Sequence, residues 1–167
     1  DEHFKLLDSL NDLEASEVFF DFKVADIAMG SGHFLVAAVD HIESRFSNYL
    51  SKRNLPEVFK ELSYLRESAI KALGEGANSY PVIEEGDLLR RQIARRCIYG
   101  IDINEVAVHL ARISLWIHTF VPGLPLFFLD KNLVYGNSLS GIGSLDEVEK
   151  FLRDLDTDGV QQSLFSV

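Results

Sequence analysis

Short apolar runs, bounded by polar residues and glycine, predict three β-strands in this chain. The runs cover residues 22–28, 97–103 and 132–135, and each has the length of a buried strand. Gly30 and Gly32 follow the first run, and glycines so placed are typical of a tight turn. The chain after this turn becomes apolar again, which predicts a strand, a glycine turn and a helix in succession.

The segments outside the strands have the 3.6-residue spacing of amphipathic helices. This spacing predicts helices over residues 4–20, from His33 onward, across most of 46–97 and over 144–154. Asn104 is a good N-cap for one more helix. The residues expected to face inward on the helix after Asn104 are Val106, Leu110, Ile113, Ile117 and Phe120.

The order of these elements is that of a βαβαβ unit, which forms parallel strands with helices on the faces of the sheet. We therefore predict an α/β fold with a doubly wound, Rossmann-like sheet, of which this chain holds a part. A helical insertion at about residues 46–96 separates the first two strands. Ligands of such sheets bind at the carboxyl ends of the strands.

Composition changes this picture mainly through charge. The 167 residues suit one domain, and 16 Lys and Arg against 26 Asp and Glu give a net charge of −10. This charge argues against a protein that holds nucleic acid through its own phosphate contacts, and against a basic membrane-surface protein. The basic cluster at residues 90–96 contains Arg90, Arg91, Arg95 and Arg96. We expect these arginines to form a solvated helix face.

The single cysteine, Cys97, excludes an internal disulfide framework and a multi-cysteine zinc site. The histidines do not have the spacing of metal ligands, so no metal site is expected. No apolar run reaches the roughly 18 residues of a membrane-spanning helix. These features indicate a reducing compartment, which for this chain means the cytoplasm.

The turn after the first strand begins with an acid, Asp26, four residues before Gly30. Two glycines allow close approach of a ligand, and the following helix offers free backbone N–H groups. A dinucleotide-binding turn would have a third glycine where Leu35 stands. A carboxylate at this place repels a pyrophosphate and suits a ligand with an ammonium group and hydroxyls. The alternative is a tight turn capped by an aspartate, without a ligand.

Two further strand ends carry polar residues. Asp102 follows the second strand and is placed to accept ribose hydroxyls, with Ile103 beside it for the flat face of a base. Asn137 follows the third strand, and its amide offers both a donor and an acceptor to the edge of a base. The alternatives are a helix-start acid favoured by the helix dipole and a plain turn.

These residues resemble the motifs of S-adenosylmethionine-dependent N6-adenine DNA methyltransferases of type II restriction–modification systems. The first family motif, Asp-Pro-Ala-x-Gly-Ser-Gly-x-Phe-Leu, matches residues 26–35, with Ile27 in place of proline. The second, Gly-hydrophobic-Asp-hydrophobic-Asn followed by Ala-Val-x-Leu-Ala-x-x-Ser-Leu-Trp, matches 100–104 and 107–116. The third, Gly-Asp/Asn-Ser-Leu, matches 136–139. The resemblance covers about residues 20–142.

The resemblance implies a role for each matching position. Asp26 and the backbone around Ala28, Gly30 and Gly32 would hold the methionine end of the cofactor. Asp102 would bind the ribose, Ile103 would lie against adenine, and Asn137 would meet the adenine amino edge. Phe34 belongs to the same implied set of S-adenosylmethionine-binding residues. The set is Asp26, Ala28, Gly30, Gly32, Phe34, Asp102, Ile103 and Asn137.

The family's catalytic motif, Asn/Asp-Pro-Pro-Tyr/Phe, does not occur, since Pro56, Pro81, Pro122 and Pro125 are not adjacent. We expect residues 1–154 to be the cofactor-binding part of a longer methyltransferase and 155–167 to be a loose tail. No catalytic residue is assigned, and double-stranded DNA would be held by parts of the parent enzyme outside this chain. The alternatives are a cofactor-binding regulatory or assembly module, and a methyltransferase that acts on RNA or protein.

Overall fold

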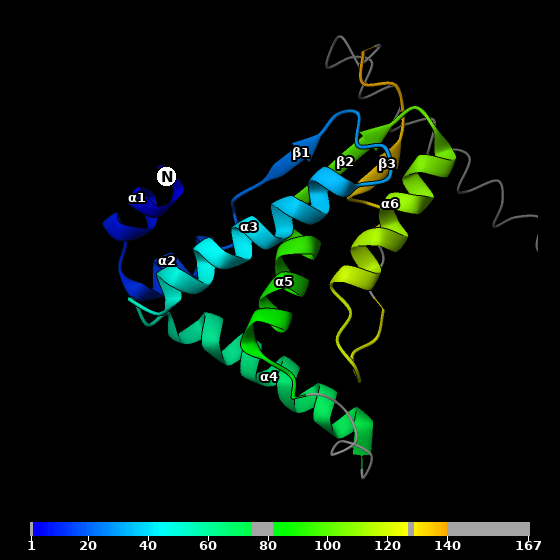
Figure 1. The fold of residues 1–167 in the computed structure, drawn as a ribbon. Helices are drawn as coiled ribbons and strands as arrows, with labels where there is room; N and C mark the ends of the chain where they lie inside the picture. The colour runs from blue at the N-terminus through cyan, green and yellow to red at the C-terminus, as the bar shows by residue number, and fades with distance from the viewer. Residues whose placement is uncertain (1, 75–81, 127–128, 140–167) are drawn as a thin grey trace, which may run out of the picture. The chain divides into compact units, whose positions relative to one another are not determined.

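Three short strands form a parallel sheet in the computed structural model, which describes residues 2–74, 82–126 and 129–139 (Figure 1). β1 (Val24–Asp26), β2 (Ile98–Asp102) and β3 (Leu133–Tyr135) lie in the order β1-β2-β3. The register places Asp26 beside Gly100 and Asp102 beside Tyr135. The three predicted strands are confirmed, and each is shorter than the apolar run that predicted it.

Six helices occur among the described residues. They are α1 (Glu2–Ser9), α2 (Asp12–Val18), α3 (His33–Leu50), α4 (Pro56–Leu73), α5 (Glu85–Arg96) and α6 (Glu105–His118). α4 and α5 lie between β1 and β2 in the sequence, where the helical insertion was expected. The chain thus has a mixed α/β fold with a small parallel sheet.

The prediction of one helix over residues 4–20 is wrong, because the chain breaks between α1 and α2. The side chain of Asn11 accepts hydrogen bonds from the N–H groups of Leu13 and Glu14, both at 3.0 Å. Glu14 in turn accepts the N–H of Asn11 at 3.3 Å. This reciprocal capping box starts a new helix. The apolar spacing continues through the break, so the spacing alone did not show it.

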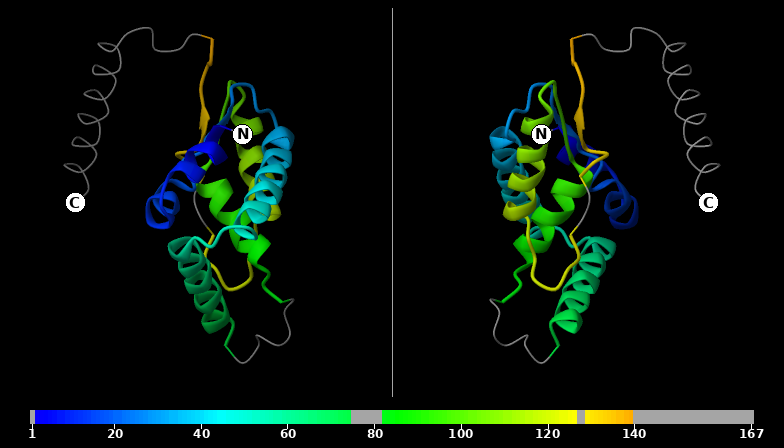
Figure 2. Two further views of the ribbon diagram at one scale, coloured as in Figure 1. Left: turned by 90° about the vertical axis from the view of Figure 1, so that its left-hand side faces the viewer. Right: turned by 90° about the vertical axis from the view of Figure 1, so that its right-hand side faces the viewer.

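α3 and α6 cover one face of the sheet (Figures 1 and 2). Both helices cross over from one parallel strand to the next, and right-handed crossovers in the same direction place them on the same side. Ile98 and Leu133 are fully buried beneath them. The side chains that alternate with these point to the opposite face. They are Ala25, Tyr99, Ile101 and Val134.

α3 is the central helix, and its apolar side is buried along its whole length. Leu35 and Val39 are fully buried, as are Leu89 and Ile93 on α5, the helix that packs against it. The apolar spacing between Asp87 and Arg96 predicts that Leu89 and Ile93 face inward, and the structure confirms this. Val58, Leu62 and Ala69 on α4 are buried as well.

The face expected to be buried on α6 is instead the exposed one. Ile117 is 73% exposed and Val106 is 65% exposed, whereas Val108, Ala111 and Leu115 are buried. α6 is apolar around most of its circumference, so the sequence did not distinguish between its faces. Contact with α3 and β3 decides which face is buried.

The chain divides into two compact units, residues 1–136 and 137–167. The sheet and the helices named above belong to the first unit. Of the second unit, residues 137–139 are described. The expected helix over 144–154 and the expected tail over 155–167 lie outside the described residues.

Candidate functional site

The loop between β1 and α3 is attached to β2 by its central residue. Met29 is 4% exposed, and its N–H donates to the carbonyl oxygen of Ile101 at 3.2 Å. The carbonyl of Met29 accepts the N–H of Gly32 at 2.9 Å, which closes the turn. A Cβ atom at Gly100 would overlap with the Met29 sulfur. The glycine of β2 therefore makes room for the residue that anchors the loop.

The two glycines of the loop are required for different reasons. Gly32 has φ of +82°, and a Cβ there would lie 3.0 Å from Cβ of Ala111 on α6. This glycine therefore allows α3 and α6 to approach closely. Gly30 has φ of +53°, and a Cβ there would meet no atom within 4 Å. The space beside Gly30 is open, as a ligand-binding turn requires.

Asp102 joins the first two sequence motifs. Its Oδ2 accepts the N–H of Gly30 at 2.8 Å, across 72 residues of sequence. Its Oδ1 accepts the N–H of Asn104, also at 2.8 Å. The hydrogen bonds from Asn104 and Gly30 hold the pKa of Asp102 below its ordinary value. The carboxylate is therefore ionised at neutral pH and lies directly against the glycine turn.

Asp26 lies at the same edge of the sheet. Its Oδ1 accepts the N–H of Ala28 at 3.0 Å, which orients the carboxylate toward the start of the loop. Asp26 is beside Gly100 in the register, and Asp102 is two residues farther along β2. Because side chains alternate along strands, the two aspartates project from the same face of the sheet. The edge therefore carries two carboxylates around an open glycine turn.

Apolar side chains are exposed next to these carboxylates. Ile103, directly after Asp102, is 66% exposed, and Phe34 in the first turn of α3 is 59% exposed. Ala28 is exposed as well. α6 begins at the same edge, where the Asn104 side chain accepts the N–H of Val106 at 3.0 Å. This cap ends β2 just after Asp102 and directs the chain into α6.

Of the eight predicted site residues, seven lie in the first unit. The structure brings Asp26, Ala28, Gly30, Gly32, Phe34, Asp102 and Ile103 to the carboxyl edge of the sheet or to the first turn of α3. Asn137 is the first residue of the second unit. Its side-chain oxygen accepts the N–H of Leu139 at 3.0 Å, in a local turn.

Sequence reasoning missed the residues that hold the loop in place. Met29 lies in the loop beside Gly100, and Ala111 on α6 lies against Gly32. Neither side chain is of a type that binds ligands or takes part in catalysis, so neither was recognised as part of the site. Met29 follows the apolar residues Ile27 and Ala28 directly, so its place in the sequence gave no separate signal. Ala111 carried no signal either, since a small residue on an apolar helix has many possible neighbours.

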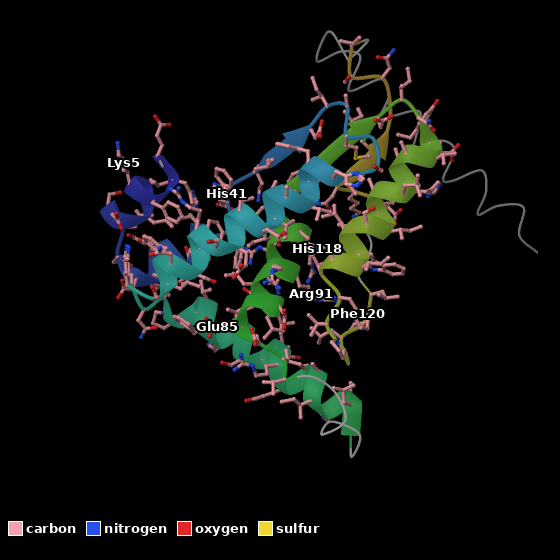
Figure 3. All side chains as sticks on the ribbon, in the orientation of Figure 1. Lys5, His41, Glu85, Arg91, His118 and Phe120 are labelled. Atoms are coloured by element: carbon pink, nitrogen blue, oxygen red, sulfur yellow. The ribbon has the colours of Figure 1, made fainter. Side chains whose placement is uncertain are left out.

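The expectation that the arginine cluster forms a solvated face is wrong for Arg91, which is 8% exposed. Arg91 donates from Nη2 to the carbonyl of Pro125, and it lies between α5 and the segment after α6 (Figure 3). Burial lowers its pKa. Arg90 pairs with Asp87 at 3.0 Å, and Arg96 stands 4.5 Å from the ring centroid of Phe20. The side chains of Arg90, Arg91 and Arg96 therefore contact other residues of this chain.

The described residues contain no group of three or more His, Cys, Asp or Glu side chains placed to hold a metal ion. Among the helices described, none is long and apolar enough to cross a membrane. Comparisons with protein-family models, with curated proteins and with solved structures find no significant match to this chain.

Proposed function

We propose that this chain binds S-adenosylmethionine at the carboxyl edge of its sheet and is the cofactor-binding part of an N6-adenine DNA methyltransferase. The observation that carries the proposal is the hydrogen bond between Gly30 and Asp102. It joins the two most specific sequence motifs into one cluster. A turn capped by an aspartate, without a ligand, does not require a second carboxylate from a distant strand.

The chemistry of the cluster fits the two ends of the cofactor. Asp26 uses one carboxylate oxygen for Ala28, and an ionised carboxylate has capacity for an ammonium group as well. Each oxygen of Asp102 accepts one backbone N–H and has a further lone pair for a ribose hydroxyl. The bound cofactor supplies an electrophilic methyl group.

The remaining positions fit the rest of the cofactor. The exposed side chain of Ile103 offers an apolar surface to adenine. The backbone of Ala28, Gly30 and Gly32 would enclose the methionine end. Two carboxylates around one turn disfavour a pyrophosphate, which argues against a dinucleotide at this site.

The face of the sheet opposite α3 and α6 supports the finer fold proposal, a doubly wound Rossmann-like domain of which this chain is a part. That face presents Ala25, Tyr99, Ile101 and Val134, and Val134 is 38% exposed. Apolar side chains on both faces are typical of parallel sheets that helices cover on both sides. Further strands and helices of a parent enzyme would provide that cover.

DNA binding and methyl transfer are assigned to the parent enzyme, in the cytoplasm. The family reaction is direct attack of adenine N6 on the methyl group, and no catalytic residue is assigned in this chain. The net charge of −10 and the internal contacts of Arg90, Arg91 and Arg96 support a chain that does not hold DNA itself. They equally suit a cofactor-binding module whose partner carries out the reaction.

The proposal is tested by titration calorimetry with S-adenosylhomocysteine, the demethylated product, which cannot react. Asp102→Ala should weaken binding at least about tenfold, since hydrogen bonds to a charged group contribute about 1.5–3 kcal/mol. Glu105→Ala is the matched control, because it removes an exposed carboxylate three residues away in the first turn of α6. Absence of binding heat with the intact chain, or equal affinities for the two variants, would contradict the assignment.

A further inference from the structure

α6 presents a row of exposed apolar side chains on the side that faces away from the sheet. Four of these side chains are each at least 49% exposed, and we call them the α6 stripe: Val106, Leu110, Ile113 and Ile117. Their spacing of four, three and four residues places them on one line along the helix. Isolated exposed apolar residues are normal on a soluble protein, whereas a contiguous row of them marks an interaction surface.

The contacts that hold α6 in the fold are made by its opposite side. Val108, Ala111 and Leu115 are buried there, and α6 packs against α3, β2 and β3. The right-hand view of Figure 2 shows α6 at the front of the first unit, with α3 behind it. The packing of the sheet and its two crossover helices therefore does not use the α6 stripe.

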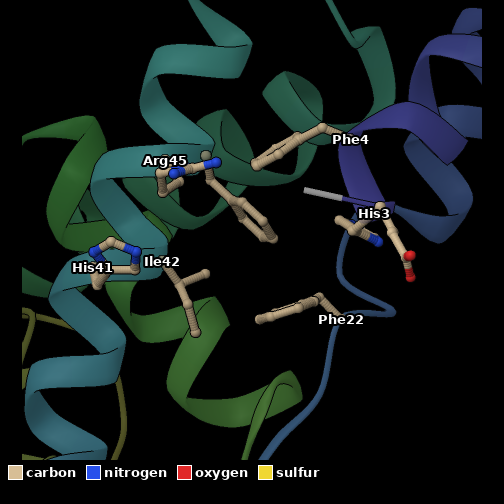
Figure 4. A pocket seen from close by; sticks show the side chains of 8 residues that line it. His3, Phe4, Phe22, His41, Ile42 and Arg45 are labelled. Carbon is tan, nitrogen blue, oxygen red and sulfur yellow. The ribbon is translucent and has the colours of Figure 1, made fainter.

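α3 shows how this chain covers an apolar helix face with its own residues. The Phe4 ring of α1 stacks on Tyr49 of α3, with the ring centroids 5.0 Å apart. The His3 ring lies 5.6 Å from Phe22 and 6.0 Å from Phe46, around the cavity drawn in Figure 4. That face of α3 thus has its partner in α1, and the α6 stripe is the better candidate for an external partner.

The spacing of the α6 stripe is that of a coiled-coil seam. Alternating steps of four and three residues correspond to the a and d positions of a heptad. Leu110 and Ile117 occupy a positions, and Val106 and Ile113 occupy d positions. Side chains at a and d pack into holes on the surface of a second helix. The spacing therefore favours a helix with an apolar seam as the partner.

A second copy of α6 provides a seam that matches the first. In an antiparallel pair, a positions lie opposite d positions, so that Val106 meets Ile117 of the partner subunit. Leu110 then meets Ile113 of the partner subunit. All four positions are paired in this register, and the two-fold symmetry closes the assembly at two copies. Opposed helix dipoles favour the antiparallel direction over the parallel one.

The residues beside the α6 stripe allow a second helix to approach. Ala107 and Ser114 flank the stripe on one side, and both are short. His109 and Trp116 flank it on the other side. None of these four residues is Lys, Arg, Asp or Glu, so a two-fold pair brings no repelling carboxylates together at the seam, although the chain has a net charge of −10.

We infer that this chain forms a two-fold dimer through the α6 stripe, with the two copies of α6 antiparallel. A helix pair of this length buries less than about 1,200 Å² in total, so the dimer is reversible and depends on protein concentration. The inference is independent of the proposed cofactor site, because no residue assigned to that site belongs to the α6 stripe.

The first test is sedimentation equilibrium of the full chain over a concentration series that reaches the millimolar range. The unmodified chain should pass from monomer to dimer. Ile113→Asp should weaken dimerisation at least about tenfold, because it places a carboxylate in an apolar contact on each copy. Ile117→Asp, at the most exposed position of the stripe, should have the same effect.

Ile70→Asp is the matched control, because Ile70 on α4 is 48% exposed and Ile113 is 49% exposed. This variant should dimerise like the unmodified chain. The inference is overturned if the unmodified chain stays monomeric throughout, if Ile113→Asp and Ile117→Asp leave dimerisation unchanged, or if Ile70→Asp weakens it equally.

The second test is disulfide crosslinking, which reports the direction of the helices. An oxidised mixture of Val106→Cys and Ile117→Cys chains should give a linked dimer with one chain of each kind. Either variant alone should give no link, since its own cysteines would lie about 16 Å apart along the helix axis. The native Cys97 is fully buried, and burial raises its pKa to about 11, so it should not compete. A mixture without a link, or a link in each variant alone, would overturn the antiparallel dimer.

Discussion

Asp102 is an acidic residue at the end of β2 that also fixes the glycine turn through a hydrogen bond. Its two carboxylate oxygens accept N–H groups from Gly30 and from Asn104, and so hold the loop before α3 and the start of α6 together. Both hydrogen bonds are stronger when the carboxylate that accepts them is ionised. The geometry of the candidate site therefore depends on the protonation state of one side chain.

This dependence predicts a transition at acidic pH. The pKa of Asp102 is lowered in the folded chain by the hydrogen bonds from Asn104 and Gly30. The ionised group therefore stabilises the fold above the ordinary aspartate pKa of about 3.9, and this contribution is lost as the pH falls through the lowered value. An NMR titration of the Gly30 amide should show its midpoint below about 3.9.

Asp102→Asn is the control for that titration, because it keeps the side-chain shape without an ionisable group. The Gly30 amide of this variant should show no such transition. A midpoint at or above the ordinary aspartate value in the unmodified chain would contradict the role assigned to the two hydrogen bonds.

At the scale of elements, α6 shows why an apolar pattern predicts a helix more reliably than its buried face. The helix and its N-cap were predicted from the spacing after Asn104, and α6 begins at Glu105. The buried face was assigned to Ile113 and Ile117, both of which are exposed. Apolar residues occupy several faces, and packing against α3 and β3 selects one of them.

The correction leads to a pair of matched substitutions on α6. Leu115→Ala should destabilise the chain by about 2–5 kcal/mol, because it leaves a cavity at a fully buried position. Ile117→Ala, at a 73% exposed position, should change the free energy of unfolding by about 0.5 kcal/mol or less. Urea denaturation of both variants measures the difference. An equal loss of unfolding free energy in the two variants, or a larger loss for Ile117→Ala, would contradict the assignment of Leu115 to the buried face of α6.

At the scale of the first unit, one arginine connects the N-terminal helices to the rest of the fold. Arg53, just after α3, donates to the carbonyls of Leu7 and Leu10 at 2.6 Å and to Asp12 at 2.9 Å. It also donates to the hydroxyl of Tyr49 at 3.0 Å. Leu7 lies in the last turn of α1 and Leu10 lies in the break before α2. Carbonyls at a helix end lack the N–H partner four residues on that they would have inside a helix.

Arg53→Met should therefore loosen α1 and α2 and lower the free energy of unfolding by about 1–3 kcal/mol, the cost of leaving part-buried acceptors unpaired. Methionine keeps much of the apolar length of the arginine stem. Hydrogen exchange should accelerate in α1 and α2 more than in α5 or α6. Lys52→Met is the neighbouring control, and similar exchange in the two variants would show that Arg53 does not hold these helices.

The strands, most helices and the order in which they occur could be predicted from the sequence, because these follow from local spacing, caps and glycine turns. The sequence also brought out Asp26, Gly30 and Asp102 as site candidates, since their residue types and positions at strand ends carry the chemistry. It did not show the break at Asn11, the buried face of α6 or the burial of Arg91.

The break at Asn11 follows from a local capping box. The buried face of α6 and the burial of Arg91 depend instead on neighbours far away in the sequence, so only the folded chain shows them. Arg91 is buried since Pro125 supplies a carbonyl to it. Gly32 is required since Ala111 lies against it. The hydrogen bond between Gly30 and Asp102 forms only when parallel pairing of β1 with β2 brings the two strand ends to one edge of the sheet. Local spacing carries no information about such partners, and packing supplies it.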